Sequence, residues 1–197
     1  MHHSLDIPYQ IILGSRSPRR HQLLSGLDIP FQVMIKETDE DYPPNLSPKD
    51  VAEYLCQKKA AAFVPELSEH PDLLIITADT LVSIDKQILN KPLNEADALR
   101  MLKLLSGRKH TVYTGVCLRN SQKTFCFSVS TDVYFRVIKA SEMAYYIEHY
   151  KPYDKAGSYG AQDWIGLSVI EKIDGCYYNV MGLPTQALYL ALLRFIS

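Results

Sequence analysis

The spacing of apolar and polar residues along the chain changes several times between strand and helix periods. The apolar run 9–13 predicts a first strand, and leucines at helical spacing predict a helix over 18–25. Pro18 suits the first position of that helix, and Ser17 is the expected N-cap, with a hydroxyl that accepts a backbone N–H. The chain therefore opens with a strand, a short turn and a helix.

The same patterns predict the later elements. The continuous apolar run 73–77 is typical of a strand buried on both faces, and we expect it to end before Asp79. Alternation over 112–118 and 124–137, around a turn at 120–121, predicts an antiparallel hairpin. We also expect a short hairpin at 83–88, strands at 31–35 and 168–173, and helices at 48–63, 95–105, 141–149 and from Pro184 to Phe195.

Together these elements predict an α/β fold in one domain over residues 1–197. We expect a mixed, strongly bent β-sheet that is flanked by helices and holds a central cleft. A polar loop at 36–46 and a glycine-bearing loop at 151–166 are the longest predicted connections.

The charge balance narrows the classes of function. The 197 residues carry a formal net charge of −1, which argues against broad binding of nucleic acid or of an anionic membrane. No run approaches the roughly 20 apolar residues of a membrane-spanning helix, and residues 1–6 lack the basic and apolar regions of a signal peptide. We therefore expect a cytoplasmic protein, and we assign no metal role to His2 or His3.

The four cysteines form no CxxC pair and have no zinc-ligand spacing with a histidine. Without a secretory signal, reduced thiols are the simplest expectation. Cys117 and Cys126 face each other if the predicted hairpin forms, which leaves a pairing between them open.

The turn at 13–20 carries the first candidate chemistry. Backbone N–H groups and the positive end of a helix dipole converge at a strand-to-helix turn, and this favours an anion. Arg19 and Arg20 add two guanidinium groups that match phosphate oxygens. The turn therefore predicts a phosphate site, and the alternative is a solvated pair of arginines on an ordinary first turn.

Acidic residues supply the second candidate. Glu40 lies in an acidic run that is either a solvated face or a metal-binding edge. Asp79 follows a buried strand, where open α/β sheets place ligands, although a carboxylate there can also simply cap a turn. We expect His110 to be packed or at the surface and not catalytic. The chain has no P-loop, no Rossmann fingerprint and no GxSxG elbow.

Six ordered blocks that span nearly the whole chain carry a family resemblance. The segment 14–20, Gly-Ser-Arg-Ser-Pro-Arg-Arg, resembles the Ser-x-Ser-Pro-Arg-Arg signature of the Maf family. Further blocks match at Ala78-Asp79-Thr80, Lys91-Pro92, Gly107–Gly115, Asp154–Gln162 and Tyr177–Pro184. The resemblance implies a Maf/ITPase-like fold and a nucleoside triphosphate pyrophosphatase, which cleaves between the α and β phosphates.

The resemblance also implies the residues that act. The catalytic acid/base position falls on Asp79, and a divalent cation, Mg²⁺ or Mn²⁺, is expected on Asp79 with Glu40. The positions implied to bind substrate are Ser15, Arg19, Arg20, Lys59, Lys91, Asp154 and Lys155. Family members are typically cytoplasmic and often homodimeric, so we expect a homodimer that binds a nucleotide and neither nucleic acid nor membrane.

Three positions bear on the choice of nucleotide. Arg19, Thr80 and Gln162 match the branch of the family that prefers dTTP and UTP. A glutamine carboxamide offers one donor and one acceptor edge, which complements the N3–H and O4 of uracil or thymine. Asp163-Trp164 departs from the small, glycine-containing pair usual in the family and could reshape the base pocket. The alternative function is a non-catalytic, nucleotide-binding regulator of cell division or septum formation, which would not need Asp79.

Overall fold

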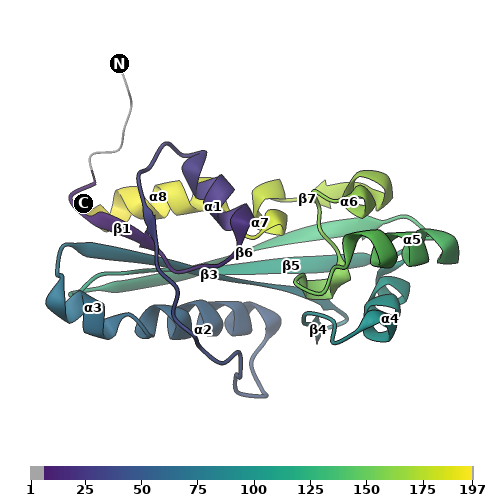
Figure 1. Cartoon of the computed structure of the whole chain (residues 1–197), viewed down its shortest axis with the longest axis horizontal. Helices are drawn as coiled ribbons and strands as arrows, with labels where there is room; N and C mark the ends of the chain where they lie inside the picture. The colour runs from purple at the N-terminus through teal and green to yellow at the C-terminus, as the bar shows by residue number, and fades with distance from the viewer. Residues whose placement is uncertain (1–6, 197) are drawn as a thin grey trace. The chain divides into compact units, whose positions relative to one another are not determined.

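The computed structural model describes residues 7–196 (Figure 1). His2 and His3 lie outside the described residues. The strands are β1 (Gln10–Leu13), β2 (Gln32–Val33), β3 (Leu73–Ile84), β4 (Gln87–Leu89), β5 (Lys109–Arg119), β6 (Thr124–Phe135) and β7 (Ile170–Asp174). The helices are α1 (Pro18–Ser25), α2 (Pro48–Ala61), α3 (Val64–Glu69), α4 (Glu95–Leu105), α5 (Ala140–Tyr150), the 3₁₀ turn η1 (Ala156–Ser158), α6 (Trp164–Val169), α7 (Tyr177–Met181) and α8 (Thr185–Ile196). No helix in the described part of the chain is long and apolar enough to cross a membrane.

Within residues 7–196, seven strands form one sheet in the order β2-β1-β3-β5-β6-β7, and β4 pairs with β3. β1 lies parallel to both β2 and β3, whereas β3–β4 and β6–β7 are antiparallel. The predicted mixed sheet with flanking helices is therefore confirmed. The chain divides into two compact units: unit 1 comprises residues up to 79, 114–129 and from 182 onward, and unit 2 comprises 80–113 and 130–181.

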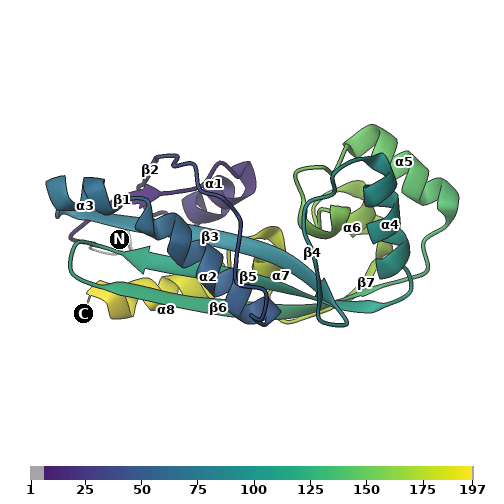
Figure 2. The same ribbon diagram turned by 90° about the horizontal axis from the view of Figure 1, so that it is seen from below.

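In unit 1, helices cover both faces of the strands. Figures 1 and 2 show α2 and α3 along one face of β3, with α1 and α8 on the other. The α2 backbone lies against Gly115 of β5, where an added Cβ would come within 2.1 Å of the Ala52 carbonyl oxygen. A side chain at this position would hold α2 away from the sheet. Gly115 therefore allows α2, the helix that carries Lys59, to pack closely against the sheet.

Unit 2 has its own apolar core. Buried residues of α4, α5 and α6 pack with residues of β3, β4, β5 and β6 in one cluster, among them Leu102, Tyr146 and Ile165. His110 lies inside this cluster with 1% of its surface exposed, and it shares a hydrogen bond with the Tyr159 hydroxyl at 2.8 Å. Burial lowers the pKa of His110 to about 4, so the ring is neutral at pH 7. It is a packed histidine, one of the two states expected from the sequence.

Several predicted boundaries are wrong, and packing explains the differences. β3 does not end before Asp79 but continues to Ile84, because the polar residues Thr77 and Asp79 both find partners on α2. The strand predicted at 168–173 begins only at Ile170. Its first two residues belong to α6, where Ile165 and Val169 lie one turn apart on the buried side.

Candidate active site

Ser15 organises the turn between β1 and α1. The turn is fixed to the sheet by Gly14, whose N–H donates to the Ile76 carbonyl at 2.8 Å. The buried Ser15 hydroxyl accepts hydrogen bonds from the Ser17 N–H at 3.2 Å and from Arg20 Nη1 at 3.3 Å. Ser17 occupies the N-cap position, but its hydroxyl makes no capping hydrogen bond. Ser17 is therefore the N-cap, as predicted, but the predicted hydrogen bond to its hydroxyl is wrong.

Arg20 reaches from α1 to the last part of unit 1. Its Nε donates to the Gly182 carbonyl at 2.8 Å, just before α8. Burial lowers the pKa of the Arg20 guanidinium, and the Asp79 carboxylate acts against this shift. Arg19, the preceding residue of α1, is half-buried and lies close enough to lower the Arg20 pKa further. The structure therefore brings Ser15, Arg19, Arg20 and Asp79 together in unit 1.

Lys59 joins the acidic loop to β3. Its ammonium contacts the Asp79 carboxylate and lies 3.5 Å from Glu40 Oε1. Asp79 is 8% exposed, so this ion pair is largely shielded from water and its electrostatic interaction is strengthened. The adjacent Lys58 instead pairs with Asp39. Lys59, the residue chosen from the sequence, is thus the one of the two lysines that contacts Asp79.

The carboxylates of Glu40 and Asp79 suit a hard cation in type but are few in number. In residues 7–196, no group of three or more His, Cys, Asp or Glu side chains could hold a metal ion. However, Mg²⁺ is commonly held by one or two carboxylates, with substrate phosphates and water as the other ligands. Two carboxylates that converge on one ammonium group fit this pattern. Glu37 and Asp39, the other acids of the run, pair with Arg16 and Lys58.

Unit 2 holds a second group of predicted residues. Lys155 Nζ lies 2.7 Å from Asp154 Oδ1 and 3.6 Å from Asp163 Oδ2. The Tyr146 hydroxyl donates to the same Asp163 oxygen at 2.7 Å and accepts from the Gly160 N–H at 3.2 Å. Burial raises the pKa of Tyr146, and its hydrogen bond to Asp163 raises it further, so the hydroxyl keeps its proton. Asp163 thereby ties α5 to the loop that contains Lys155.

Of the remaining predicted residues, Gln162 lies on this loop, Lys91 lies next to it and Thr80 lies in β3. Gln162 is exposed at its end, and Thr80 is half-buried in β3 directly after Asp79. Lys91 follows Asn90, whose carbonyl accepts from the Gly157 N–H at 3.2 Å. Gly157 has φ +66°, which favours glycine, and this conformation shapes the loop at its contact with the Lys91 segment.

Tyr146 and the Gly182 carbonyl were not predicted as parts of the site. Tyr146 carried no sequence signal beyond its helical spacing, because its role depends on a partner 17 residues away. Gly182 lay inside a quoted family block, but a backbone acceptor leaves no mark in side-chain patterns. Such contributions become visible only when the fold is known.

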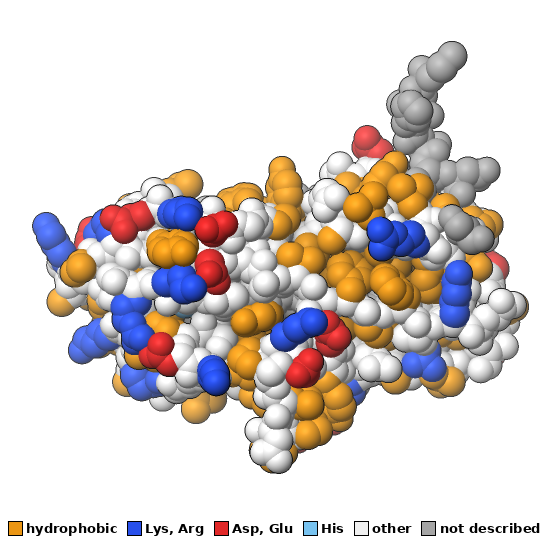
Figure 3. All heavy atoms as spheres, turned by 180° about the vertical axis from the view of Figure 1, so that it is seen from behind, with side chains coloured by type: hydrophobic (Ala, Val, Ile, Leu, Met, Phe, Trp, Pro, Cys, Tyr) orange, Lys and Arg blue, Asp and Glu red, His pale blue; other side chains and the backbone are white. Residues whose placement is uncertain are grey.

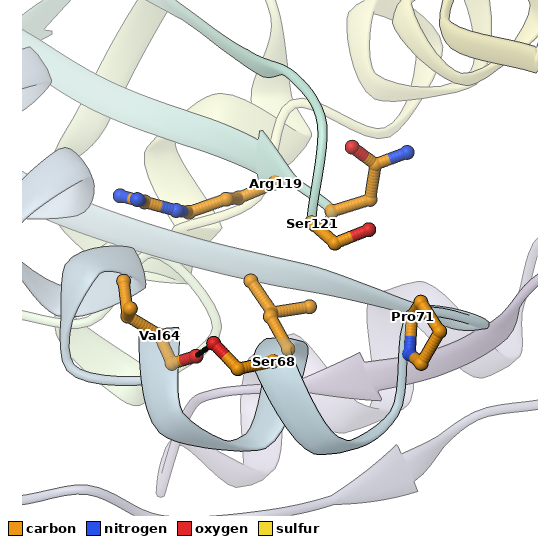
Figure 4. Close-up of a pocket in the computed structure, with 7 residues that line it drawn as sticks. Val64, Ser68, Pro71, Arg119 and Ser121 are labelled. Atoms are coloured by element: carbon orange, nitrogen blue, oxygen red, sulfur yellow. Dashed lines mark hydrogen bonds between the residues drawn. The ribbon is translucent and has the colours of Figure 1, made fainter.

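A pocket of about 240 Å³ also lies in unit 1, between α3 and the β5–β6 turn (Figure 4). Val64, Ser68 and Pro71 line one side, and the Ser68 hydroxyl donates to the Val64 carbonyl at 3.0 Å. Arg119 and Ser121 lie opposite. None of the predicted site residues lines this pocket.

Comparison with known proteins places the chain in a family. A family model described as Maf-like protein matches residues 10–195. A Porphyromonas gingivalis relative named dTTP/UTP pyrophosphatase is 50% identical over 182 residues, 92% of each chain. A Bacteroides fragilis relative of the same name is 46% identical and covers 92% of this chain and 93% of its own. A solved dITP/XTP pyrophosphatase from Mycobacterium abscessus aligns over 94% of this chain and 96% of that one, at 14% identity and a TM-score of 0.41, which is too distant to carry an argument. The chain belongs to the Maf family.

Proposed function

We propose that this chain hydrolyses dTTP and UTP to the nucleoside monophosphate and pyrophosphate, with a divalent cation. The observation that carries the proposal is the contact of Lys59 with Asp79 and Glu40, in the same unit as the Ser15–Arg20 turn. This group combines cations for phosphate oxygens with a shielded carboxylate. The names of the two relatives, at 46–50% identity, supply the substrate class.

Basic residues of unit 1 bind the phosphates in this proposal. Arg19 and Arg20 project from α1 next to the turn whose backbone N–H groups favour an anion. Arg20 is held by Ser15 and Gly182, so little side-chain entropy is lost when phosphate binds. Lys59 adds a further cation from α2. It exchanges its contact with Asp79 for a phosphate oxygen when substrate arrives.

Asp79 accepts the proton of the attacking water. Release of Lys59 toward phosphate leaves the carboxylate free to orient a water and to take its proton as the oxygen attacks the α-phosphorus. Asp79 and Glu40 would hold the Mg²⁺ or Mn²⁺ ion, which neutralises charge on the phosphate oxygens when bound. The bond between the α-phosphorus and its bridging oxygen breaks, and pyrophosphate leaves.

Gln162 recognises the base. Its carboxamide is exposed and can place a donor opposite O4 and an acceptor opposite N3–H of uracil or thymine. Cytosine reverses this pattern at position 4. The hydrogen bond between Tyr146 and Asp163 fixes the residue next to Gln162. The other residues of unit 2 that we assign to substrate are Thr80, Lys91, Asp154 and Lys155.

We also propose that the protein acts as a cytoplasmic homodimer without a nucleic-acid or membrane partner. The net charge of −1 supports the absence of nucleic acid. On the face drawn in Figure 3, basic and acidic side chains are interspersed among apolar ones. Light scattering on the purified protein tests the dimer, and fractionation of the source cells tests the location.

A product assay tests the activity. The protein is incubated with each common NTP and dNTP and with 7-methyl-GTP, with Mg²⁺, with Mn²⁺ and with EDTA, and nucleotide products and pyrophosphate are resolved. We expect monophosphate and pyrophosphate from dTTP and UTP, and no product in EDTA. Diphosphate and orthophosphate would contradict the assigned bond. Binding of nucleotide without turnover would support the regulator instead.

A matched pair of variants tests the role of Asp79. Asp79→Asn removes the proton acceptor, and we expect turnover to fall about 10²–10⁴-fold. Asp72→Asn is the control, because Asp72 directly precedes the same strand and its exposed carboxylate accepts a hydrogen bond from Gln10 Nε2, at 2.7 Å. Equal activity of the two variants would remove Asp79 from the mechanism.

A further inference from the structure

Three of the four cysteines lie together in unit 1, where Cys56 is on the same helix as Lys59. Cys56 of α2 and Cys117 of β5 are buried, and they pack with Ala60 and with Cys126 of β6. Cys126 is partly exposed. Cys176 lies in the other unit and is not in this cluster. All four thiols are free in the structure.

The pairing of β5 with β6 places two of these cysteines opposite each other. Asn120 N–H donates to the Lys123 carbonyl at one end of the hairpin, and Phe135 N–H donates to the Arg108 carbonyl at the other. Both bonds give the same register, in which Cys117 lies opposite Cys126. The two bonds also fix the alternation, so this is a non-hydrogen-bonded pair with Cα atoms about 4.5 Å apart. That separation is within the range that a disulfide spans, roughly 4.4–6.8 Å.

The surroundings make Cys126 the reactive member. A hydrogen bond from the Cys117 thiol lowers the pKa of Cys126, and the nearby Cys56 and Arg119 act in the same direction. The hydrogen bond to Cys126 and then burial raise the pKa of Cys117. The thiol with the lowered pKa is therefore also the one of the three that solvent reaches best. A thiolate, and not a thiol, attacks a peroxide.

We propose that Cys117 and Cys126 form a reversible disulfide when the protein meets a hydroperoxide. The Cys126 thiolate attacks one peroxide oxygen, the O–O bond breaks, and Cys126 becomes a sulfenic acid while hydroxide leaves. The Cys117 thiol then gives up its proton, its sulfur attacks Cys126 Sγ, and water leaves as the S–S bond forms. In total, two thiols lose two electrons and one hydrogen peroxide becomes two waters.

Cys56 is the competing partner, and its position disfavours it. Its thiol also lies 3.1 Å from the Glu53 carbonyl of its own helix and donates to it. A disulfide from Cys56 to Cys126 would require α2 to move relative to the sheet, and the close contact between Gly115 and Ala52 fixes that helix in place. A disulfide from Cys117 requires no movement of a helix, because the hairpin already holds Cys117 opposite Cys126.

Peptide mapping of the full chain tests the proposal without a variant. The protein is treated with hydrogen peroxide, remaining thiols are blocked with N-ethylmaleimide, and trypsin cuts after Arg119 and Lys123. We expect loss of two thiols and a linked pair of peptides, 110–119 with 124–136, which dithiothreitol separates. A link from peptide 50–58 to 124–136, or four intact thiols, would overturn the assignment.

Variants then order the two steps. Cys117→Ser is expected to retain a sulfenic acid at Cys126 that dimedone traps, and Cys126→Ser is expected to slow thiol loss by at least about tenfold. Cys176→Ser is the control, with unchanged thiol loss at the other sites. A dimedone adduct on Cys117 of wild-type protein, or unchanged thiol loss in folded Cys126→Ser, would refute Cys126 as the attacking group.

Discussion

Gly115→Ala is the sharpest test of how the fold positions Lys59. An added Cβ at residue 115 would lie 2.1 Å from the Ala52 carbonyl oxygen and 2.4 Å from the carbonyl carbon. Real Cβ atoms essentially never come within 3.0 Å of such atoms. The obstacle is helix backbone, so it cannot turn aside as a side chain does. α2 must move outward by about 1 Å, and Lys59 moves with it.

We expect Gly115→Ala to lose both stability and activity. Overpacking of this kind costs about 1–3 kcal/mol, which lowers the melting temperature of a chain of this size by about 2–12 °C. A displacement of about 1 Å at a catalytic group can reduce turnover about 100-fold. We therefore expect both a lower melting temperature and lower activity at temperatures where the variant is folded.

Gly26→Ala is the matched control. Gly26 has φ −68°, and an added Cβ would meet carbonyl oxygens at 3.5 and 3.6 Å, which is ordinary contact. This substitution is expected to leave activity unchanged and to raise stability by about 0.4–1 kcal/mol. Thermal unfolding followed by circular dichroism, with turnover of dTTP, measures both. A Gly115→Ala variant that melts within about 1 °C of wild type would refute the packing argument.

Three further predictions concern single side chains. Lys59→Met is expected to raise the KM for dTTP about tenfold or more, since it removes a charged hydrogen bond, while Lys58→Met changes it little; equal effects in steady-state assays would contradict the geometry. Tyr146→Phe leaves the Gly160 N–H and Asp163 without the hydroxyl and should cost about 1–3 kcal/mol in urea unfolding; a variant as stable as wild type would count against that network. Hydrogen bonds from Arg136 and the Lys139 N–H lower the pKa of Glu142 to about 2 from 4.5, so its contribution to stability is present above pH 4.5 and is lost as pH falls toward 2. The difference in unfolding free energy between wild type and Glu142→Gln should therefore shrink over that range, and a constant difference would refute the linkage.

Local sequence signals predicted the helices well where caps are strong. Ser47 accepts from the Asp50 N–H at the start of α2, and Asn94 accepts from the Asp97 N–H at the start of α4. Both starts were predicted at the correct residue. These signals operate within one turn of the chain, so they need no knowledge of the fold.

The course of β3 could not be predicted in the same way. A polar residue after an apolar run normally suggests that a strand has ended. Here Thr77 and Asp79 point to the same face, since strand side chains alternate, and both meet α2: Thr77 donates to the Cys56 carbonyl at 2.6 Å, and Asp79 contacts Lys59. The partners lie about 20 residues away in sequence. The strand continues because tertiary contacts satisfy its polar groups.

The candidate site also has parts that the sequence predicts and parts that depend on tertiary contacts. Three residues that the family motifs identify, Arg20, Lys59 and Asp79, lie together in unit 1. The groups that hold them, the Gly182 carbonyl and the backbone contact at Gly115, could not be predicted because they are backbone atoms. Spacing identifies reactive side chains more readily than it identifies their supports.

The position of the attacked phosphorus tests the central claim most directly. dTTP is hydrolysed in ¹⁸O-labelled water with Mg²⁺, the products are separated, and their ¹⁸O content is measured by mass spectrometry. Attack at the α-phosphorus, with Asp79 as proton acceptor, predicts one ¹⁸O in thymidine monophosphate and none in pyrophosphate. Asp79→Asn is expected to form the labelled monophosphate about 10²–10⁴-fold more slowly. Label in pyrophosphate, or labelled monophosphate at the wild-type rate from Asp79→Asn, would contradict the proposed mechanism.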